Sequence, residues 1–345
     1  MDLGPLDCSE VADQLTALRG QPTDPSLTAA IHRRSGGNPL FVESLNDSDG
    51  AGPVNLRGLL LERVARLPAP ARDLLATAAG AGAHVSDQLL ASVAGLCDDG
   101  LRDALRILVE RGQLITDADG YAFRHDLIRE AVYTDLLPIE RRRLHRRFAE
   151  ALRDSDDRTA TERVPELARH WAAAGVAREA LVAAWQAASI HRGRTAFGEE
   201  LRQLEIVLDH WYAVPDAAAL IDSDRLDVLE QAIAAAIAGG STHRGLAHAE
   251  EALHALDPPN PERRAILLCQ QARLLNRLDA TGHQAIDEAL SLVPPGRNDD
   301  VRRLVLAHSI GVGATEAHLG DLAERTAELT ELAGRAGDPL GLAWS

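Results

Sequence analysis

The chain has 345 residues and a formal net charge of −16, with 46% hydrophobic residues and only 3% aromatic ones. Alanine and leucine carry the apolar content and both favour helix over strand, so a mainly α fold is expected. The acidic balance argues against a chain that grips nucleic acid along its whole length, because neutralising phosphates needs a basic surface.

Two further features bear on the compartment. No apolar run approaches the roughly eighteen residues that a membrane span needs, and the N-terminus lacks the basic and apolar regions of a signal peptide. Cys8, Cys97 and Cys269 are odd in number and far apart, which indicates buried thiols and neither a disulfide framework nor a zinc site. A cytoplasmic protein without membrane contact is expected.

Residues 1–46 are predicted to form a small helical domain. Apolar spacing indicates helices over 8–19, with Ser9 as the N-cap, and over 25–35, where Asp24-Pro25 places proline at the first helical position. Gly36-Gly37 ends the second helix and Pro39 begins a third. A linker rich in Asp, Ser and Gly follows at 47–54.

Residues 55–154 are predicted to form a winged helix with the helices that follow it. Helical patterns cover 55–67, 69–80, 86–95 and 99–111. Two short β-like runs within 113–124 flank Asp119-Gly120, a favourable hairpin turn. The pattern then returns to helix over 126–137 and 139–154. Three helices and a β-hairpin are typical of a winged helix.

Residues 155–345 are predicted to be an α-solenoid similar to tetratricopeptide (TPR) repeats. Similar helices open at Arg225, Arg263 and Arg302, at offsets of 263 − 225 = 38 and 302 − 263 = 39. Alanine-rich partner helices follow each of them, and the pair at 178–193 and 196–213 fits the same scheme. A helix-pair period near 38 is close to the TPR length of about 34 with longer turns.

Signals of catalysis are absent from the sequence. It contains no lysine, so a phosphate loop of the G-x-x-x-x-G-K-[ST] type is missing the side chain that reaches the β- and γ-phosphates. There is no H-E-x-x-H, no G-x-S-x-G and no His/Cys cluster at metal-ligand spacing. We therefore expect neither an enzyme nor a metal site.

Two stretches, RRSGGNPLFVESL at 33–45 and YAFRHDLIREAVY at 121–133, carry a family resemblance. With the order of the predicted domains, they resemble the STAND ATPases, specifically the LuxR-type and MalT-like bacterial transcriptional regulators. The resemblance implies a remnant of the NTPase helical lid, a winged helix and part of a repeat sensor. It also implies that the P-loop core and the C-terminal helix-turn-helix of that family are lacking.

The resemblance assigns nucleotide-sensor roles to two residues. Pro39 matches the proline that packs on the adenine, and His125 matches the histidine that contacts the β-phosphate of bound ADP. The plainer alternatives are a helix stop followed by a proline-initiated helix, and an Asp126 N-cap beside a half-buried His125. Because the phosphate loop is missing, both positions are expected to be vestigial. No cofactor is expected for this chain, whereas intact family members bind ADP or ATP.

Charge patterns disfavour direct DNA binding. The helix expected to be the recognition helix, 98–111, is net acidic, unlike a helix that enters a major groove. The basic cluster at 141–147 has Leu144, Phe148 and Leu152 on one face, which indicates a solvated basic face of an amphipathic helix. The alternative is a patch that contacts nucleic acid or an acidic partner.

The repeats offer a candidate ligand surface. The residues concerned are arginines near the starts of the first helices, which the period would align as a ladder: Arg225, Arg263, Arg264, Arg302 and Arg303. An anionic effector or acidic peptide could dock on them; alternatively, each arginine pairs with a neighbouring acid such as Asp224, Glu262 or Asp300.

The sequence thus predicts a non-catalytic, signal-sensing fragment of a LuxR-type STAND regulator that binds a protein or small effector through its repeats. One alternative is an ATP-binding regulator completed by a separate P-loop NTPase chain. The other is a general TPR-type peptide-binding scaffold.

Overall fold

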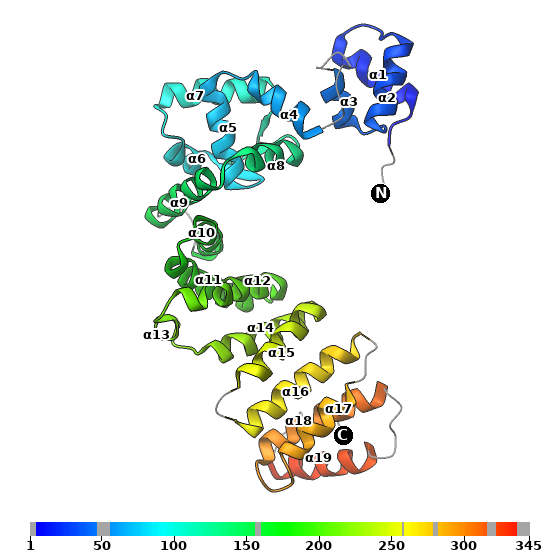
Figure 1. Cartoon of the computed structure of the whole chain (residues 1–345), viewed down its shortest axis with the longest axis vertical. Coiled ribbons are helices and arrows are strands. Elements are labelled where there is room, and N and C mark those ends of the chain that lie inside the picture. Colours follow the sequence, from blue (N-terminus) through cyan, green and yellow to red (C-terminus); the bar gives the residue numbers. More distant parts are fainter. Residues whose placement is uncertain are drawn as a thin grey trace. The chain divides into compact units, whose positions relative to one another are not determined.

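The computed structural model describes residues 5–46, 56–155, 160–256, 259–278, 282–315 and 322–336. Within them the chain is mainly α-helical with one small antiparallel sheet, as predicted (Figure 1). It divides into two compact units, Met1–Leu152 and Arg153–Ser345. The predicted linker at 47–54 lies outside the described residues.

Three short helices begin the first unit: α1 (Cys8–Arg19), α2 (Pro25–Ser35) and α3 (Pro39–Asn46). All three were predicted, but the N-cap of α1 was assigned to the wrong residue. The carboxylate of Asp7 accepts hydrogen bonds from the backbone N–H groups of Ser9 (2.8 Å) and Glu10 (2.9 Å), and Glu10 completes a capping box. The three helices close over a common core, which consists of Val11, Leu15, Ile31, Val42 and Leu45.

The next part of the unit combines four helices with a sheet. The helices are α4 (Leu56–Ala65), α5 (Ala69–Ala81), α6 (Asp87–Ala94) and α7 (Asp98–Glu110), and the strands are β1 (His84–Ser86), β2 (Leu114–Thr116) and β3 (Gly120–Phe123). The strand order is β1-β3-β2, with both pairings antiparallel. The sequence predicted the β2–β3 hairpin but not β1, which is only three residues long and pairs with β3 across thirty-odd residues of chain.

The hairpin forms, but its turn differs from the predicted one. Thr116 pairs with Tyr121, and the N–H of Asp117 donates to the Gly120 carbonyl at 3.0 Å, so the loop precedes Gly120. Gly120 is a strand residue that pairs with Ser86 of β1. A Cβ atom built on it would lie 2.2 Å from the Val85 carbonyl oxygen. Close approach of β1, and not a left-handed backbone, therefore requires glycine here.

Two helices complete the unit, α8 (Asp126–Asp135) and α9 (Pro138–Asp154). On α9 the predicted apolar face is confirmed, since Leu144, Phe148 and Leu152 are buried. The arginines of 141–147 lie at its margins and outer face: Arg147 donates to the Val93 carbonyl, and Arg141 lies over the Tyr133 ring, 5.6 Å from its centroid.

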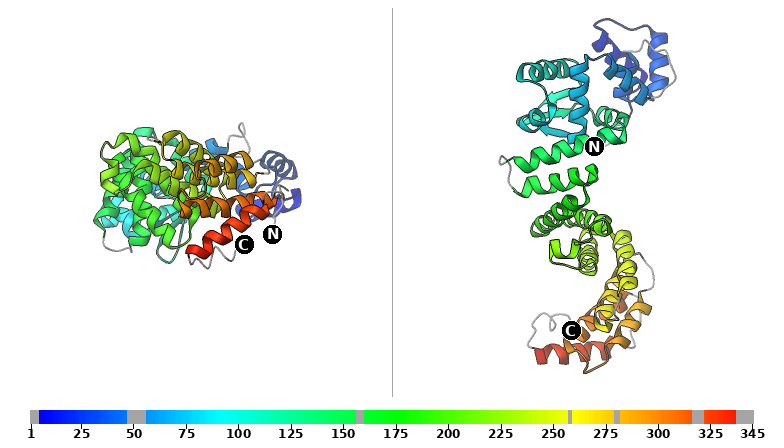
Figure 2. Two further views of the ribbon diagram at one scale, coloured as in Figure 1. Left: turned by 90° about the horizontal axis from the view of Figure 1, so that it is seen from below. Right: turned by 60° about the vertical axis from the view of Figure 1, so that its left-hand side comes forward.

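The second unit is a stack of helices: α10 (Ala160–Ala174), α11 (Ala177–Gly193), α12 (Phe197–His210), the 3-10 turn η1 (Trp211–Ala213), α13 (Ala217–Ile221), α14 (Arg225–Gly239), α15 (Thr242–Ala255), α16 (Pro261–Asn276), α17 (His283–Leu292), α18 (Asp299–Thr315) and α19 (Leu322–Ala336). The three predicted pairs are α14–α15, α16–α17 and α18–α19, and the looser earlier pair is α11–α12. Figure 2 shows the stack from two further sides. These are the predicted TPR-like helical repeats.

Small side chains let neighbouring helices of the second unit approach closely. Ala236, Ala249 and Ala272 are fully buried, and a Cβ atom on Gly245 would lie 2.9 Å from the Cβ of Ala236. The first helices of successive pairs pack on each other, α14 on α16 and α16 on α18, without comparable packing between α15 and α17 in the described part of the chain. The first-helix side is therefore the tighter side of the array, which in a solenoid is the concave one.

The cysteines are not uniformly buried, contrary to the prediction. Cys8 and Cys97 are exposed, whereas Cys269 is buried, and burial raises the pKa of its thiol to about 12. Among the described helices, none is both long and apolar enough to cross a membrane.

Candidate ligand sites

Pro39 lies where the sequence placed it, at the first position of α3. Gly36 and Gly37 end α2 with left-handed φ values of 57° and 74°, and a Cβ atom on Gly37 would lie 2.2 Å from the Leu6 carbonyl oxygen. The Pro39 ring is exposed, and its carbonyl accepts a hydrogen bond from Gln14 Nε2 at 2.9 Å. The local geometry is that of a helix stop followed by a proline-initiated helix.

His125 immediately precedes α8, and α3 supplies its charged neighbour. Its Nε2 lies 3.9 Å from Glu43 Oε2, and this buried nitrogen has no hydrogen-bond partner among the described residues. Burial lowers the pKa of His125; Glu43 opposes this shift, and the nearby Arg124 and Arg63 reinforce it. The structure thus brings the element that carries Pro39 next to His125.

Asp126 does not have the N-cap role considered for it. It is the first residue inside α8, and its carboxylate accepts hydrogen bonds from Arg129 Nε at 2.6 Å and Nη2 at 3.2 Å. The Arg129 hydrogen bond, followed by its charge, lowers the pKa of Asp126 despite some burial.

Three of the five predicted repeat arginines occupy equivalent positions: Arg225, Arg264 and Arg302, at offsets of 39 and 38. Each pairs with a glutamate on the second helix of its own pair. Arg225 pairs with Glu251, Arg264 with Glu288 at 2.8 Å, and Arg302 with Glu328 at 2.8 Å. The arginine of the second pair that is equivalent to Arg225 and Arg302 is therefore Arg264, and not Arg263 as the spacing in the sequence predicted.

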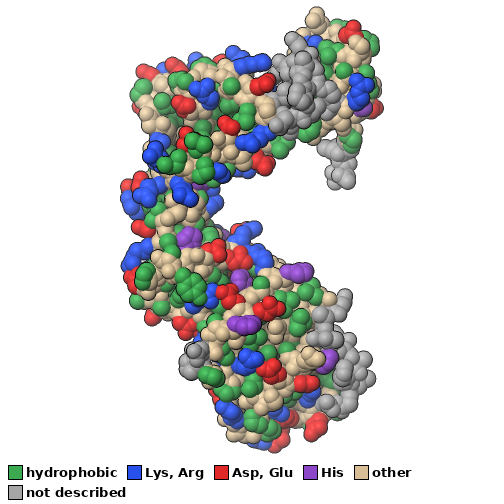
Figure 3. All heavy atoms as spheres, viewed as in Figure 1, with side chains coloured by type: hydrophobic (Ala, Val, Ile, Leu, Met, Phe, Trp, Pro, Cys, Tyr) green, Lys and Arg blue, Asp and Glu red, His purple; other side chains and the backbone are tan. Residues whose placement is uncertain are grey.

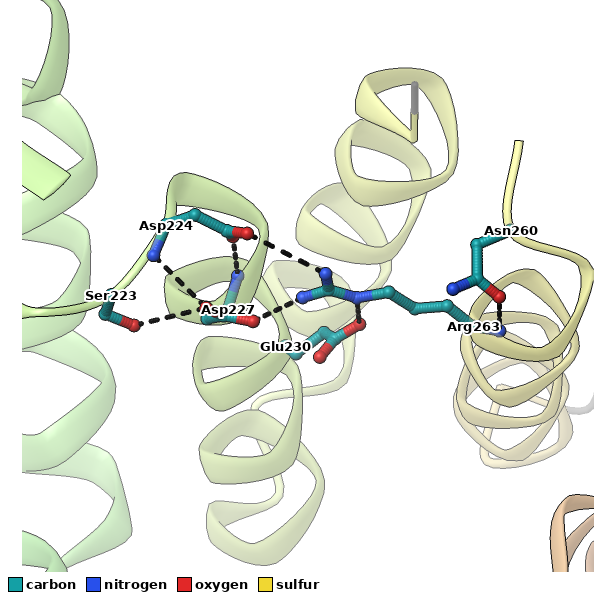
Figure 4. Close-up of polar contacts among 6 residues, drawn as sticks. All are labelled: Ser223, Asp224, Asp227, Glu230, Asn260 and Arg263. Atoms are coloured by element: carbon teal, nitrogen blue, oxygen red, sulfur yellow. Dashed lines mark hydrogen bonds and ion pairs between the residues drawn. The ribbon is translucent and has the colours of Figure 1, made fainter. Parts of the chain in front are cut away.

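Arg263 instead joins two successive repeats. Its Nε donates to Glu230 at 2.6 Å and its Nη2 to Asp227 at 2.5 Å, while Nη1 lies 3.8 Å from Asp224 (Figure 4). The Glu230 hydrogen bond is the main cause that raises the pKa of Arg263. Asn260 caps the start of α16 by accepting from the Arg263 N–H at 3.0 Å. An acidic face of α14 is thus bound to the first turn of α16.

Arg302 and Arg303 diverge although they are adjacent. The Arg302 side chain is only 11% exposed and also donates to two carbonyls at the end of α17. Arg303 lies 3.3 Å from the largely exposed Asp300, one of the acids anticipated from the sequence. The predicted arginines therefore make internal ion pairs.

Two of these arginines also line a cavity of about 680 Å³ at the starts of α14 and α16. Arg225 and Arg263 share its wall with Arg297, Tyr212 and Glu262, together with Asp224 and several apolar and proline residues. Tyr212 is 81% exposed, and its ring centroid lies 5.0 Å from the Arg225 guanidinium carbon. The Nε of Arg225 is buried and has no hydrogen-bond partner within the described part of the structure.

Sequence reasoning missed Tyr212, Arg297 and His248. Tyr212 lies in η1, before the first predicted arginine helix, so no repeat pattern indicates it. His248 is 14% exposed, and its Nε2 lies 3.2 Å from a Glu205 carboxylate oxygen, to which Arg244 also donates at 2.7 Å. These residues tie α15 to α12.

No family model matches the chain. It is 31% identical to an uncharacterized protein of Rhizobium meliloti (strain 1021) over an alignment of 207 residues, and the match covers 54% of this chain and 20% of that protein. The chain therefore spans about a fifth of the length of this curated relative.

Among solved structures, one match is a crystal structure of a Signal Transduction ATPase with Numerous Domains (STAND) protein with a tetratricopeptide repeat sensor from Pyrococcus horikoshii. It covers 99% of this chain and 62% of the other, with 12% identity and a TM-score of 0.36. That score is too low to establish a shared arrangement, so the fold assignment rests on the elements of this chain.

Proposed function

We propose that the chain is the non-catalytic, signal-sensing part of a LuxR-type STAND regulator and that its helical repeats bind a protein partner. In this proposal α1–α3 are the remnant of the lid, α4–α9 with the hairpin are a winged helix, and α10–α19 are the sensor. The order α5–β1–α6–α7–β2–β3, with a three-stranded antiparallel sheet, supports the winged-helix assignment.

The winged helix is proposed to contact protein and not DNA. Helix α7 has Asp98 and Asp99 in its first turn, and Arg102 on the same helix is paired with Asp99 at 2.9 Å. On the face seen in Figure 3, acidic and basic side chains of the described residues are interspersed, without a broad basic field. Neither feature suits a surface that neutralises phosphates.

The proposal of a non-catalytic role rests on the missing lysine. Phosphoryl transfer is catalysed almost wholly by positioning and by stabilising charge on the phosphates, and the phosphate-loop lysine is a central part of that. Every cation among the 36 Lys+Arg residues is an arginine. Neither Pro39 nor His125 can replace this function.

The observation that carries the partner proposal is the exposed Tyr212 ring over Arg225 at the 680 Å³ cavity. Tyrosine and arginine are enriched among residues that dominate binding energy, and the cavity wall offers charges of both signs beside apolar surface. A peptide segment of a partner, with an acidic side chain for Arg225 and an apolar one for the proline-lined wall, fits this surface.

The experiment selects dodecapeptides from a phage-displayed random library on the whole chain and measures the enriched peptides by fluorescence polarisation. Tyr212→Ala is expected to weaken binding at least roughly tenfold, and Arg225→Gln to weaken acidic peptides most. Arg178→Gln is the matched control. Arg178 does not line the cavity, and it forms an exposed ion pair with Asp216, with 2.7 Å between the nitrogen and the oxygen. Peptides that bind the Tyr212→Ala variant as tightly as the original chain would contradict the assignment.

A second candidate function is a nucleotide-binding regulator completed by a separate P-loop chain. The observation that favours it is the unpartnered Nε2 of His125 beside the helix that carries the exposed Pro39. An imidazole nitrogen of this kind can donate to a phosphate oxygen. ADP titration of the chain, described in the Discussion, separates this candidate from the first.

A further inference from the structure

A second cavity of the repeats, of about 490 Å³, lies between the C-terminal part of α16 and the middle of α18. It is on the first-helix side of the array. The residues that line it include Arg273, Asn276, Arg277, Leu304 and His308, with two small residues beside them. None of the five arginines singled out from the sequence contributes to it.

Among the residues that the structure describes, the lining of this cavity is basic and contains no carboxylate. Arg273 is exposed and has no ion-pair or hydrogen-bond partner among the residues that the structure describes. Arg277 donates through Nη1 to the Ile237 carbonyl at 2.6 Å. This hydrogen bond fixes the position of the guanidinium and leaves its other N–H groups available to a ligand. The chain carries 52 acidic against 36 basic side chains, yet neither of these two arginines has an ion-pair partner among the described residues.

These two arginines do not recur from repeat to repeat, although Arg277 also joins α16 to α14 through the Ile237 carbonyl. The equivalent positions 39 residues earlier, in α14, are Ala234 and Ala238, and the equivalent of Arg273 on α18 is Gly311. The internal pairs of Arg225, Arg264 and Arg302, in contrast, recur in the three successive helix pairs from α14 to α19. A charge that does not recur at the neighbouring repeats, and that no acid among the described residues neutralises, is suited to contacting a ligand.

The rest of the wall limits the kind of ligand. Leu304 is 40% exposed at the cavity, an apolar surface that gains by being covered. His308 Nδ1 lies 2.8 Å from the Leu304 carbonyl, so its other ring nitrogen is available for a polar group of a ligand. The volume is within the range of about 300–1,000 Å³ that small-molecule sites occupy, and a bare inorganic ion would leave most of it empty.

We infer that this cavity binds a small organic anion, with its carboxylate or phosphate head group between Arg273 and Arg277 and its apolar body against Leu304. Both head groups accept the paired N–H donors of a guanidinium, so they share one recognition chemistry. The inference does not depend on whether the Tyr212 cavity binds a peptide.

The test uses the whole chain and four probes in isothermal titration: benzoate, phenyl phosphate, the neutral benzamide and inorganic phosphate. We expect benzoate, phenyl phosphate or both to bind, with affinity that falls as salt is added, because exposed charges are screened over about 8 Å at physiological ionic strength. Binding by one of the two anions alone identifies the head group. Benzamide and inorganic phosphate should bind at least roughly tenfold more weakly than the better organic anion.

Variants locate the site. Arg273→Gln and Leu304→Glu should each weaken the organic anion at least roughly tenfold, the first by removing a donor pair and the second by adding a repelling carboxylate. Both residues are exposed, and unchanged circular dichroism would verify that each variant folds. Arg194→Gln removes an exposed arginine outside the cavity and should change affinity less than about twofold. The inference is overturned if neither benzoate nor phenyl phosphate binds at concentrations up to about 10 mM, or if Arg273→Gln binds the organic anion as tightly as the original chain does.

Discussion

The prediction that the structure supports in most detail concerns Arg302, the least exposed of the repeat arginines. Its Nε and Nη2 donate to the two carboxylate oxygens of Glu328 at 2.9 and 2.8 Å, and its Nη1 donates to the carbonyls of Leu290 (3.2 Å) and Val293 (2.9 Å). One side chain on α18 therefore binds both α17 and α19. Arg302→Ala removes all four hydrogen bonds.

The cost can be estimated from the burial of the groups that remain. Removing one partner of a buried pair costs about 3–5 kcal/mol, because the other charge stays buried and unpaired. The Arg302 side chain is 11% exposed and that of Glu328 28%, so water partly solvates the remaining carboxylate and the lower end applies. We expect a loss of about 3 kcal/mol in the local stability of α17–α19.

Hydrogen exchange measured by mass spectrometry is the appropriate assay, because a repeat array can open locally without unfolding as a whole. A loss of about 3 kcal/mol corresponds to roughly a hundredfold faster exchange in peptides from α17 and α19. Peptides from α11 and α12 should be unaffected. In a double-mutant cycle with Glu328→Gln, the two changes should be less than additive, because either one breaks the same pair.

Arg335→Ala on α19 is the matched control. Arg335 pairs with Glu331 at 2.5 Å on the surface, and its side chain is 61% exposed, so its removal should leave the exchange rates unchanged. Equal exchange in Arg302→Ala and Arg335→Ala would refute the reasoning, because burial of the pair would then have no energetic consequence.

Three further predictions concern other parts of the molecule. Gly120→Ala places a Cβ atom against the Val85 carbonyl oxygen and should destabilise the first unit by about 1–3 kcal/mol, measured by thermal unfolding; Gly198→Ala, where nothing lies within 4 Å, should not. Burial raises the pKa of Glu205, but hydrogen bonds from Arg244 and His248 outweigh it and lower the pKa below its ordinary 4.5. The ionised carboxylate therefore stabilises the fold fully above pH 4.5, and this stabilisation is lost as the pH falls through the lowered pKa. Glu205→Gln should accordingly make the stability depend less on pH in the acid range. The chain should release no phosphate from ATP and bind ADP no tighter than roughly millimolar; micromolar binding abolished by His125→Ala would instead favour the nucleotide-binding candidate.

The sequence predicted the helices well because their limits depend on local interactions. Asp24 and Pro25 begin α2, Gly36 ends it, and Pro39 begins α3, each through its own backbone preferences. The period of 38–39 residues likewise indicated stacked helix pairs, because each pair must bury one face on the next. The hairpin was predicted from two β-like runs around a turn that was placed too late by about one residue.

Other features depend on contacts between distant segments, and only the tertiary structure decided them. Strand β1 exists because β3 pairs with it, and Gly120 is constrained by that pairing and not by its own turn. Whether Arg263 or Arg264 is equivalent to Arg225 depends on which side of α16 faces Glu288. The sequence cannot distinguish the two, because both residues of the pair Arg263-Arg264 are arginines. The cavities at Tyr212 and Arg273 arise where neighbouring helices leave space between them, a quantity that no local pattern along the chain encodes.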